Sequence, residues 1–201
     1  MIKNIIFDFG DVFIDLDKEG LRHSLQSLGI KEWNSELNTL NESFEKGRCS
    51  EEFFLSEIQK HSSNKNLEEI KSSWCTILGD FPLHRLEFLE QLVTKNYRLF
   101  LLSNTDAIHI AHFQKKVGSD FYNRFYNCFE KVYFSFEMGL RKPQTEIYTQ
   151  VLSENNLISS ETLFVDDKKE NTDAAEDLGI QVWTLKVGEE DVIELFDKVK
   201  F

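Results

Sequence analysis

The chain has 201 residues, of which 41% are hydrophobic and 29% are charged, as is typical of a folded globular protein. Its formal net charge of −12 argues against a nucleic-acid partner, because phosphate backbones attract basic surfaces. No apolar stretch approaches the roughly 20 residues of a membrane-spanning helix, and the sequence begins with an expected strand instead of a signal peptide. We therefore expect a cytoplasmic protein with neither a nucleic-acid nor a membrane partner.

The first expected element is a strand near the N-terminus, within residues 2–12. Apolar residues at positions 5 to 7 are followed abruptly by Asp8. Such a continuous apolar run suits a strand that is buried on both faces of a parallel sheet. Asp8 then lies at the carboxyl end of the strand, where open α/β sheets place their active sites, and Gly10 lets the backbone turn sharply. The alternating residues 12–17 suit a short hairpin.

The next segment, from Lys18 to about Phe81, has apolar residues at helical spacing. Gly29 is typical of a helix end, and Ser50 followed by two glutamates is typical of a helix start. Residues 62–66 form a predicted polar loop, and no convincing strand pattern interrupts the segment. We therefore expect two domains, an α/β core of residues 1–15 and 82–201 and a helical domain of residues 16–81.

The remainder of the chain alternates between expected strands and helices, which predicts a doubly wound parallel sheet. The expected strands are 98–103, 131–136, 162–166 and 181–185, and the expected helices are 84–96, 106–116, 144–155, 171–178 and 192–199. Pro143 suits the first turn of the third of these helices.

Polar residues follow three of the expected strands and should meet at one edge of the sheet. Asp8 follows the first strand, Ser103 ends the second, and Asp166 and Asp167 end the fourth, while Lys142 lies in a loop before a helix. Clustered carboxylates repel one another unless a cation is present, and their hard oxygen ligands suit Mg²⁺. A carboxylate beside Mg²⁺ can attack phosphorus, and a lysine with a hydroxyl can hold the phosphoryl oxygens.

The order Asp8, Ser103, Lys142, Asp166–Asp167 resembles the four motifs of the haloacid dehalogenase superfamily over nearly the whole chain. The sequences Asp-x-Gly-x-Val, Ser-Asn-Thr and Lys-Pro are most similar to its branch of sugar-phosphate phosphatases with a small helical cap. The resemblance implies a Rossmann-like core with residues 16–81 as the cap. It also implies an Mg²⁺-dependent phosphatase that forms an aspartyl phosphate and acts, as a monomer or homodimer, on a small phosphorylated metabolite.

The resemblance also assigns roles to individual residues. Asp8 is the expected nucleophile, and Lys142 should neutralise the phosphoryl group and Asp8. Ser103 should donate a hydrogen bond to a phosphoryl oxygen, assisted by the backbone N–H or side chain of Asn104. The expected metal ligands are the carboxylates of Asp8 and Asp166, the backbone carbonyl of Gly10, and Asp167 acting through water or by orienting Lys142.

Position 10 departs from the family pattern, which commonly has a second aspartate there as a general acid and base. Gly10 keeps the carbonyl ligand but removes an acid-base group of the kind that contributes about 10²–10⁴ in rate. Three explanations remain open: a slow enzyme, a substitute group, or substrates with good leaving groups such as anomeric sugar phosphates and acyl phosphates. Asp11 is a candidate substitute, although a turn residue is its simpler interpretation.

Two other functions remain open at this point. A haloacid dehalogenase needs no acid at position 10, because its aspartate attacks carbon, and a phosphate-binding protein without turnover needs none either. Among the neighbouring residues, we expect Arg141 to be a surface charge, Asn171 to orient the Asp166–Asp167 loop, and His109 to have no role.

Overall fold

The computed structural model describes residues 1–63 and 66–201, so two positions of the predicted polar loop, 64 and 65, lie outside the described residues. Its centre is a sheet of five parallel strands in the order β3-β2-β1-β4-β5. The strands are β1 (Asn4–Phe7), β2 (Arg98–Ser103), β3 (Lys131–Phe134), β4 (Thr162–Asp166) and β5 (Gln181–Thr184). This order confirms the predicted doubly wound parallel sheet and places β1 in the middle, buried along its whole length.

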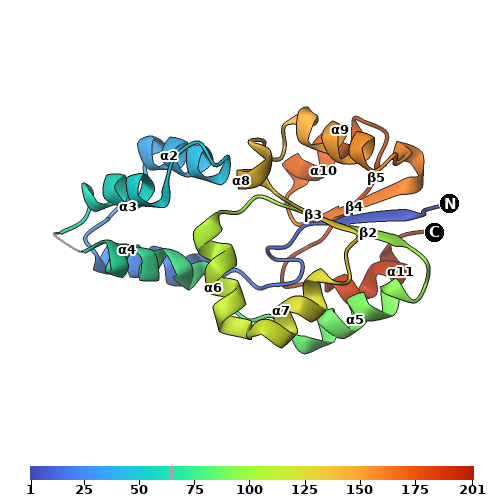
Figure 1. The fold of residues 1–201 in the computed structure, drawn as a ribbon, viewed down its shortest axis with the longest axis horizontal. Helices are drawn as coiled ribbons and strands as arrows, with labels where there is room; N and C mark the ends of the chain where they lie inside the picture. The colour runs from blue at the N-terminus through green and yellow to red at the C-terminus, as the bar shows by residue number, and fades with distance from the viewer. Residues whose placement is uncertain (64–65) are drawn as a thin grey trace.

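Helices cover both faces of this sheet, as Figure 1 shows. One face packs on α5 (Leu83–Val93), α6 (Ala107–Val117), α7 (Ser119–Tyr126) and α11 (Leu195–Lys198), and the other on α9 (Thr145–Glu154) and α10 (Lys169–Glu176). Successive residues of the strands alternate between the two cores: Ile5 and Phe7 join the first, whereas Ile6 joins the second. Since side chains of a strand point alternately to opposite faces, a sheet covered on both sides requires an unbroken apolar run.

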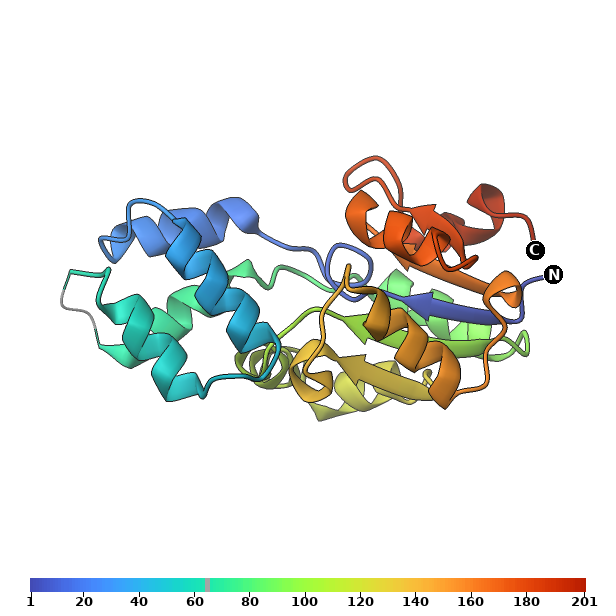
Figure 2. The same cartoon turned by 90° about the horizontal axis from the view of Figure 1, so that it is seen from above.

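A separate layer of helices lies at one end of the molecule, beyond the carboxyl edge of the sheet (Figure 2). It consists of α1 (Lys18–Ser27), α2 (Ser35–Glu45), α3 (Glu51–Gln59) and α4 (Leu67–Trp74), and a 3-10 turn, Cys75–Ile77, follows α4. Side-chain oxygens of Asn34, Ser50 and Asn66 cap the starts of α2, α3 and α4, as the sequence pattern at Ser50 predicts. These helices bury their apolar faces against one another in a core of their own, centred on Phe44, Phe54 and Trp74.

Three local predictions differ from the structure. Residues 12–17 form no hairpin; the chain turns tightly after β1, and Leu16 makes only an isolated bridge to Leu78. The third strand ends at Phe134, where the short helix α8 (Ser135–Met138) begins, and helix α7 has no counterpart among the predicted elements. Pro143 precedes α9 and does not belong to its first turn, because the N-cap of that helix is Gln144.

The described helices include none that is both long enough and apolar enough to cross a lipid bilayer. The longest of them, such as α2 and α5, have 11 residues and bury one face each against the protein.

The core of the helical layer gives a direct test of its packing. Phe54 is fully buried and stacks on Phe44 with ring centroids 4.1 Å apart, whereas its neighbour Phe53 is 51% exposed. We expect Phe54→Ala to lower the free energy of unfolding by about 3–5 kcal/mol through cavity formation. Phe53→Ala should change it by less than about 0.5 kcal/mol. Urea denaturation measures both, and equal losses in the two variants would contradict this packing.

Candidate functional site

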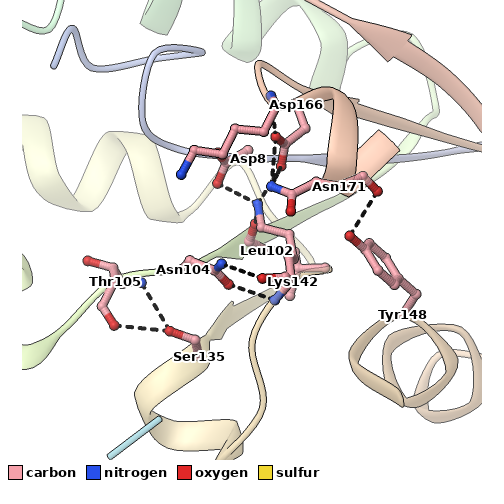
Figure 3. Close-up of polar contacts among 10 residues, drawn as sticks. Asp8, Leu102, Asn104, Thr105, Ser135, Lys142, Tyr148, Asp166 and Asn171 are labelled. Carbon is pink, nitrogen blue, oxygen red and sulfur yellow. Dashed lines mark hydrogen bonds and ion pairs between the residues drawn. The ribbon is translucent and has the colours of Figure 1, made fainter. Parts of the chain in front are cut away.

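The polar side chains that follow β1, β2 and β4 meet at the carboxyl edge of the sheet. Asp8 follows β1, Ser103 ends β2 and Asp166 ends β4, and the pairing register sets their strands side by side. Lys142 reaches the same point from the loop between α8 and α9 (Figure 3). Parallel pairing brings these groups together because it aligns the carboxyl ends of strands that are distant in sequence.

Lys142 lies at the centre of this cluster and is completely buried. Its Nζ lies 2.7 Å from Oδ1 of Asp8, 2.6 Å from Oδ2 of Asp166 and 2.8 Å from the carbonyl oxygen of Leu102. An ammonium group has three N–H donors, so these partners use all of them. Burial lowers the pKa of Lys142, but the two carboxylates outweigh that effect and keep its pKa above the usual value.

The backbone of Lys142 is fixed by a second set of contacts, which come from Asn104. The Asn104 side chain accepts a hydrogen bond from the Lys142 N–H and donates one to the Lys142 carbonyl, both at 2.9 Å. The same residue was predicted to help bind phosphate through its backbone N–H or its side chain. Its side-chain amide is engaged with Lys142, so the role that this amide performs in the structure is positioning the lysine loop.

Asp166 is held by groups from the start of the following helix. Asn171 Nδ2 donates to both carboxylate oxygens, at 2.9 and 3.0 Å, and the Lys168 N–H donates to Oδ1 at 2.8 Å. The Tyr148 hydroxyl of α9 donates in turn to the Asn171 carbonyl at 2.9 Å (Figure 3). Asn171 therefore orients this loop. Asp167 was expected to orient Lys142 or to act through water, but the carboxylate of this loop that contacts Lys142 is that of Asp166, and no ion pair joins Lys142 to Asp167 among the described residues.

Asp8, Asp166 and Asp167 can each offer a carboxylate oxygen to one metal ion, since these atoms lie within 4.8 Å of one another. Burial raises the pKa of Asp8 to about 7 even though Lys142 opposes it, and burial together with Asp166 raises the pKa of Asp167. Lys142 is the shared partner of Asp8 and Asp166, and Asp167 lies 4.0 Å from the Lys18 ammonium, so the three carboxylates carry more negative charge than Lys142 alone balances. The donor set therefore fits a divalent cation with a preference for oxygen ligands.

A cavity of about 460 Å³ opens beside this cluster, between the sheet edge and the helical layer. From the core it is lined by Gly10 and by Ser103, Asn104 and Thr105, the residues at the end of β2. Ser103 is the predicted phosphate-binding hydroxyl, and it lies at the floor of this cavity. The Thr105 segment is held from behind by Ser135, whose hydroxyl bonds both the N–H and the carbonyl of Thr105 at 3.0 Å.

The helical layer contributes an aromatic wall to the same cavity. Trp33 stacks on Trp74 with centroids 5.4 Å apart, and Trp74 stacks on His109 of α6 at 5.1 Å. The Asp106 carboxylate accepts hydrogen bonds from the Trp74 indole at 3.0 Å and pairs with His109 Nδ1 at 2.9 Å. Burial lowers the pKa of His109, but Asp106 outweighs it and holds the pKa above the usual value. His109 is therefore a satisfied buried residue that joins α6 to α4.

Two basic residues take positions that the sequence analysis did not anticipate. Arg141 was expected to be a surface charge; instead it bonds Glu45 of α2 at 2.9 Å and lies 3.5 Å from Glu42, which ties the Lys142 loop to the helical layer. Lys18, the first residue of α1, lies 2.6 Å from Asp11 and 4.0 Å from Asp167. No sequence pattern signals these contacts, because Glu45 and Asp167 are distant in sequence from Arg141 and Lys18, and the Lys18–Asp11 contact forms across an irregular turn.

Comparison with known proteins agrees with this geometry. A family model described as haloacid dehalogenase-like hydrolase matches residues 5–185. A D-ribitol-5-phosphate phosphatase from Bacteroides thetaiotaomicron is 29% identical over 189 residues, which cover 91% of each chain. A haloacid dehalogenase family enzyme of the same organism, solved in complex with magnesium, superposes with a TM-score of 0.87 at 32% identity and covers 98% of this chain and 99% of its own. A predicted hydrolase of this type from Porphyromonas gingivalis gives a TM-score of 0.82 at 27% identity, with 98% and 97% covered. The chain therefore belongs to the haloacid dehalogenase-like hydrolase family.

Proposed function

We propose that this protein is a magnesium-dependent phosphatase that hydrolyses a small phosphomonoester through an aspartyl phosphate on Asp8. The observation that carries the proposal is the buried Asp8–Lys142–Asp166 cluster beside Asp167. Its near neighbours in the chain, Gly10 and Lys168, line a cavity together with Ser103. Further support comes from the similar magnesium-bound structure and the D-ribitol-5-phosphate phosphatase, which makes a sugar or polyol phosphate the preferred substrate class.

Magnesium would be held by Asp8, Asp166 and Asp167 together with the backbone carbonyl of Gly10. When bound, it would neutralise charge on the phosphoryl oxygens and so favour attack by an anion. Lys142 performs the same electrostatic task from within the protein, because its ammonium lies against Asp8 and cannot move away from its three partners.

The reaction follows from these positions in two steps. A carboxylate oxygen of Asp8 attacks phosphorus, the bond to the leaving oxygen breaks, and that oxygen takes the electron pair. The Ser103 hydroxyl donates a hydrogen bond to a phosphoryl oxygen, and the Lys142 ammonium stabilises the negative charge of the phosphoryl group from its place beside Asp8. Water then attacks the phosphorus of the aspartyl phosphate, which releases inorganic phosphate and restores the Asp8 carboxylate. Gly10 offers no side chain to activate that water.

The helical layer acts, in this proposal, as a cap domain formed by residues 16–81. Its aromatic wall and the core residues enclose a cavity of about 460 Å³, which lies within the range of about 300–1,000 Å³ found for small-molecule sites. A cap that closes over the substrate would exclude bulk water from the aspartyl phosphate.

The cytoplasmic location of the protein remains a prediction.

The two alternative functions receive less support from the site. A dehalogenase attacks carbon and needs no metal, so it gives no reason for a third carboxylate beside Asp8 and Asp166. The hypothesis of a phosphate-binding protein without turnover is supported only by the absence of an acid-base side chain at Gly10. Chloride release from a haloacid in the absence of magnesium would favour the first alternative, and tight phosphate binding without hydrolysis would favour the second.

Hydrolysis of p-nitrophenyl phosphate tests the proposal directly. We expect release of p-nitrophenolate with Mg²⁺, its loss with EDTA, and its loss in Asp8→Asn, which keeps the shape of the side chain but removes the nucleophile. No release by the wild-type protein with Mg²⁺ would exclude the phosphatase, because this leaving group needs no acid. Release that persists in Asp8→Asn would exclude Asp8 as the nucleophile.

Metal binding can be tested without activity. Mg²⁺ should raise the melting temperature of the wild-type protein, because a ligand that binds only the folded state stabilises it. Asp166→Asn should remove that shift, since it removes a buried carboxylate from the donor set. Asp173→Asn is the matched control, as Asp173 lies exposed on α10 and its only ion pair among the described residues is with Lys169. The same shift in Asp166→Asn and the control would contradict the assigned site.

The absence of an acid-base side chain at position 10 predicts the shape of the progress curve. With p-nitrophenyl phosphate the first step needs no acid, whereas hydrolysis of the aspartyl phosphate lacks an activated water. We therefore expect a burst of about one p-nitrophenolate per active site followed by a slower steady rate. Mass spectrometry of acid-quenched protein should show one added phosphoryl group during that phase. A linear progress curve from the first turnover would show that the second step is not limiting.

A further inference from the structure

We propose that the ammonium group of Lys18 stabilises the negative charge that develops on the leaving-group oxygen, in place of the side chain that position 10 lacks. The proposal rests on the proposed phosphatase activity and names one more catalytic residue for it. It follows from what occupies the space around Gly10, from how Asp11 is bonded, and from where Lys18 lies.

The space next to Gly10 is already filled by another residue. A Cβ atom added at Gly10 would lie 2.9 Å from Cδ1 and 3.4 Å from Cγ of Leu16. Leu16 is held in that place by the bridge between its backbone and Leu78, and its side chain lines the cavity. An acid-base side chain at position 10 is therefore replaced by an apolar surface, and the missing charge has to come from another element.

Asp11 is not free to replace the acid-base side chain that position 10 lacks. Its carboxylate accepts a hydrogen bond from the Leu16 N–H at 3.0 Å through Oδ1 and binds Lys18 Nζ at 2.6 Å through Oδ2. Only 4% of its side chain is exposed, and its backbone adopts a left-handed conformation with φ of 55°. Both oxygens of Asp11 are thus committed to holding the turn and Lys18, which makes Asp11 a positioning residue.

Lys18 has the properties that the task requires. It lines the same cavity as Gly10 and Ser103, and its ammonium lies between the carboxylates of Asp11 and Asp167. Among the described residues only Asp11 lies within hydrogen-bonding distance of it, so donors remain for a ligand. Its side chain is 57% exposed, in contrast to the fully enclosed Lys142, and a substrate oxygen can therefore reach it.

The contribution of Lys18 belongs to the first step of the reaction. The Asp8–phosphorus bond forms, the bond between phosphorus and the leaving oxygen breaks, and the electron pair stays on that oxygen. The ammonium stabilises the resulting anion through charge and a hydrogen bond and keeps its own proton, and the alkoxide takes a proton from water. The effect grows with the basicity of the leaving group, because a nitrophenolate carries its charge on the ring and an alkoxide does not.

The test compares Lys18→Met with wild type on p-nitrophenyl phosphate, phenyl phosphate and D-ribitol 5-phosphate at saturating Mg²⁺. We expect kcat/KM to fall by about 10²-fold for the primary alkyl phosphate and by less than about threefold for p-nitrophenyl phosphate, with phenyl phosphate between them. Lys18→Arg keeps the charge and should retain most of the alkyl activity. Lys60→Met removes a similar exposed lysine, paired with Glu57 at 2.7 Å on α3, and should change none of the three.

Equal losses on all three substrates in Lys18→Met would overturn the proposal, because a structural or metal-binding role does not depend on the leaving group. Lys168 also lines the cavity, and Asp11 holds Lys18. A larger selective loss in Lys168→Met or in Asp11→Asn than in Lys18→Met would therefore also overturn the proposal, in favour of that residue. If the wild-type protein hydrolyses p-nitrophenyl phosphate, each of these outcomes would refute the role of Lys18 and leave the proposed phosphatase activity standing. If it does not, the phosphatase itself is excluded and the assignment of Lys18 is excluded with it.

Discussion

The structure depends on one buried cation, the ammonium group of Lys142, which holds two carboxylates from different strands within 2.7 Å. Asp8 and Asp166 lie side by side because β1 and β4 are neighbours, and without a cation between them their charges would repel one another. Burying one member of such a cluster alone is costly, since a buried charge needs a partner to replace its water. The same contact that makes the sheet edge stable therefore also places an ammonium group beside Asp8, the carboxylate proposed as the nucleophile.

The positions of the other residues follow from the need to fix that ammonium. Asn104 holds the Lys142 backbone at both its N–H and its carbonyl, and Asn171 holds Asp166 at both oxygens. Asn104 also lines the cavity, whereas Asn171 does not, and each amide removes a degree of freedom from a charged residue. Catalysis by fixed charges requires such rigidity, because a charge that must reorient during the reaction loses part of its effect. Hydrogen bonds from two asparagine side chains thus keep the Lys142 loop and the Asp166 carboxylate in place.

The sequence predicted the groups that strand ends bring together and missed those that loops bring together. Asp8, Ser103 and Asp166 each follow an apolar run, and parallel pairing places the ends of such runs at one edge whatever the loops do. Lys142 was proposed from its place in a loop before an expected helix, and the family resemblance then supported it, since a loop lysine has no periodic pattern to locate it. Arg141 and Lys18 were beyond prediction because their partners, Glu45 and Asp11, are met only when the helical layer folds against the core. The alternation at residues 12–17 indicated a hairpin, but it arises from a turn in which Leu16 packs into the space beside Gly10.

The helical layer and the core are joined by charged and aromatic groups at the rim of the cavity. Arg141 connects the Lys142 loop to α2, and the Asp106 carboxylate accepts a hydrogen bond from Trp74 of α4. Lys18, the first residue of α1, contacts Asp11 of the core. A purely apolar joint between two such layers would resist separation, whereas ion pairs can exchange their partners for water at little cost when they open. In the proposed phosphatase, a cap that admits a charged phosphate and releases another would benefit from contacts of this kind. Lys18 would then belong to the cap and its partners to the core, so closing the cap would also complete the set of charges around the leaving group and make the closed state the reactive one.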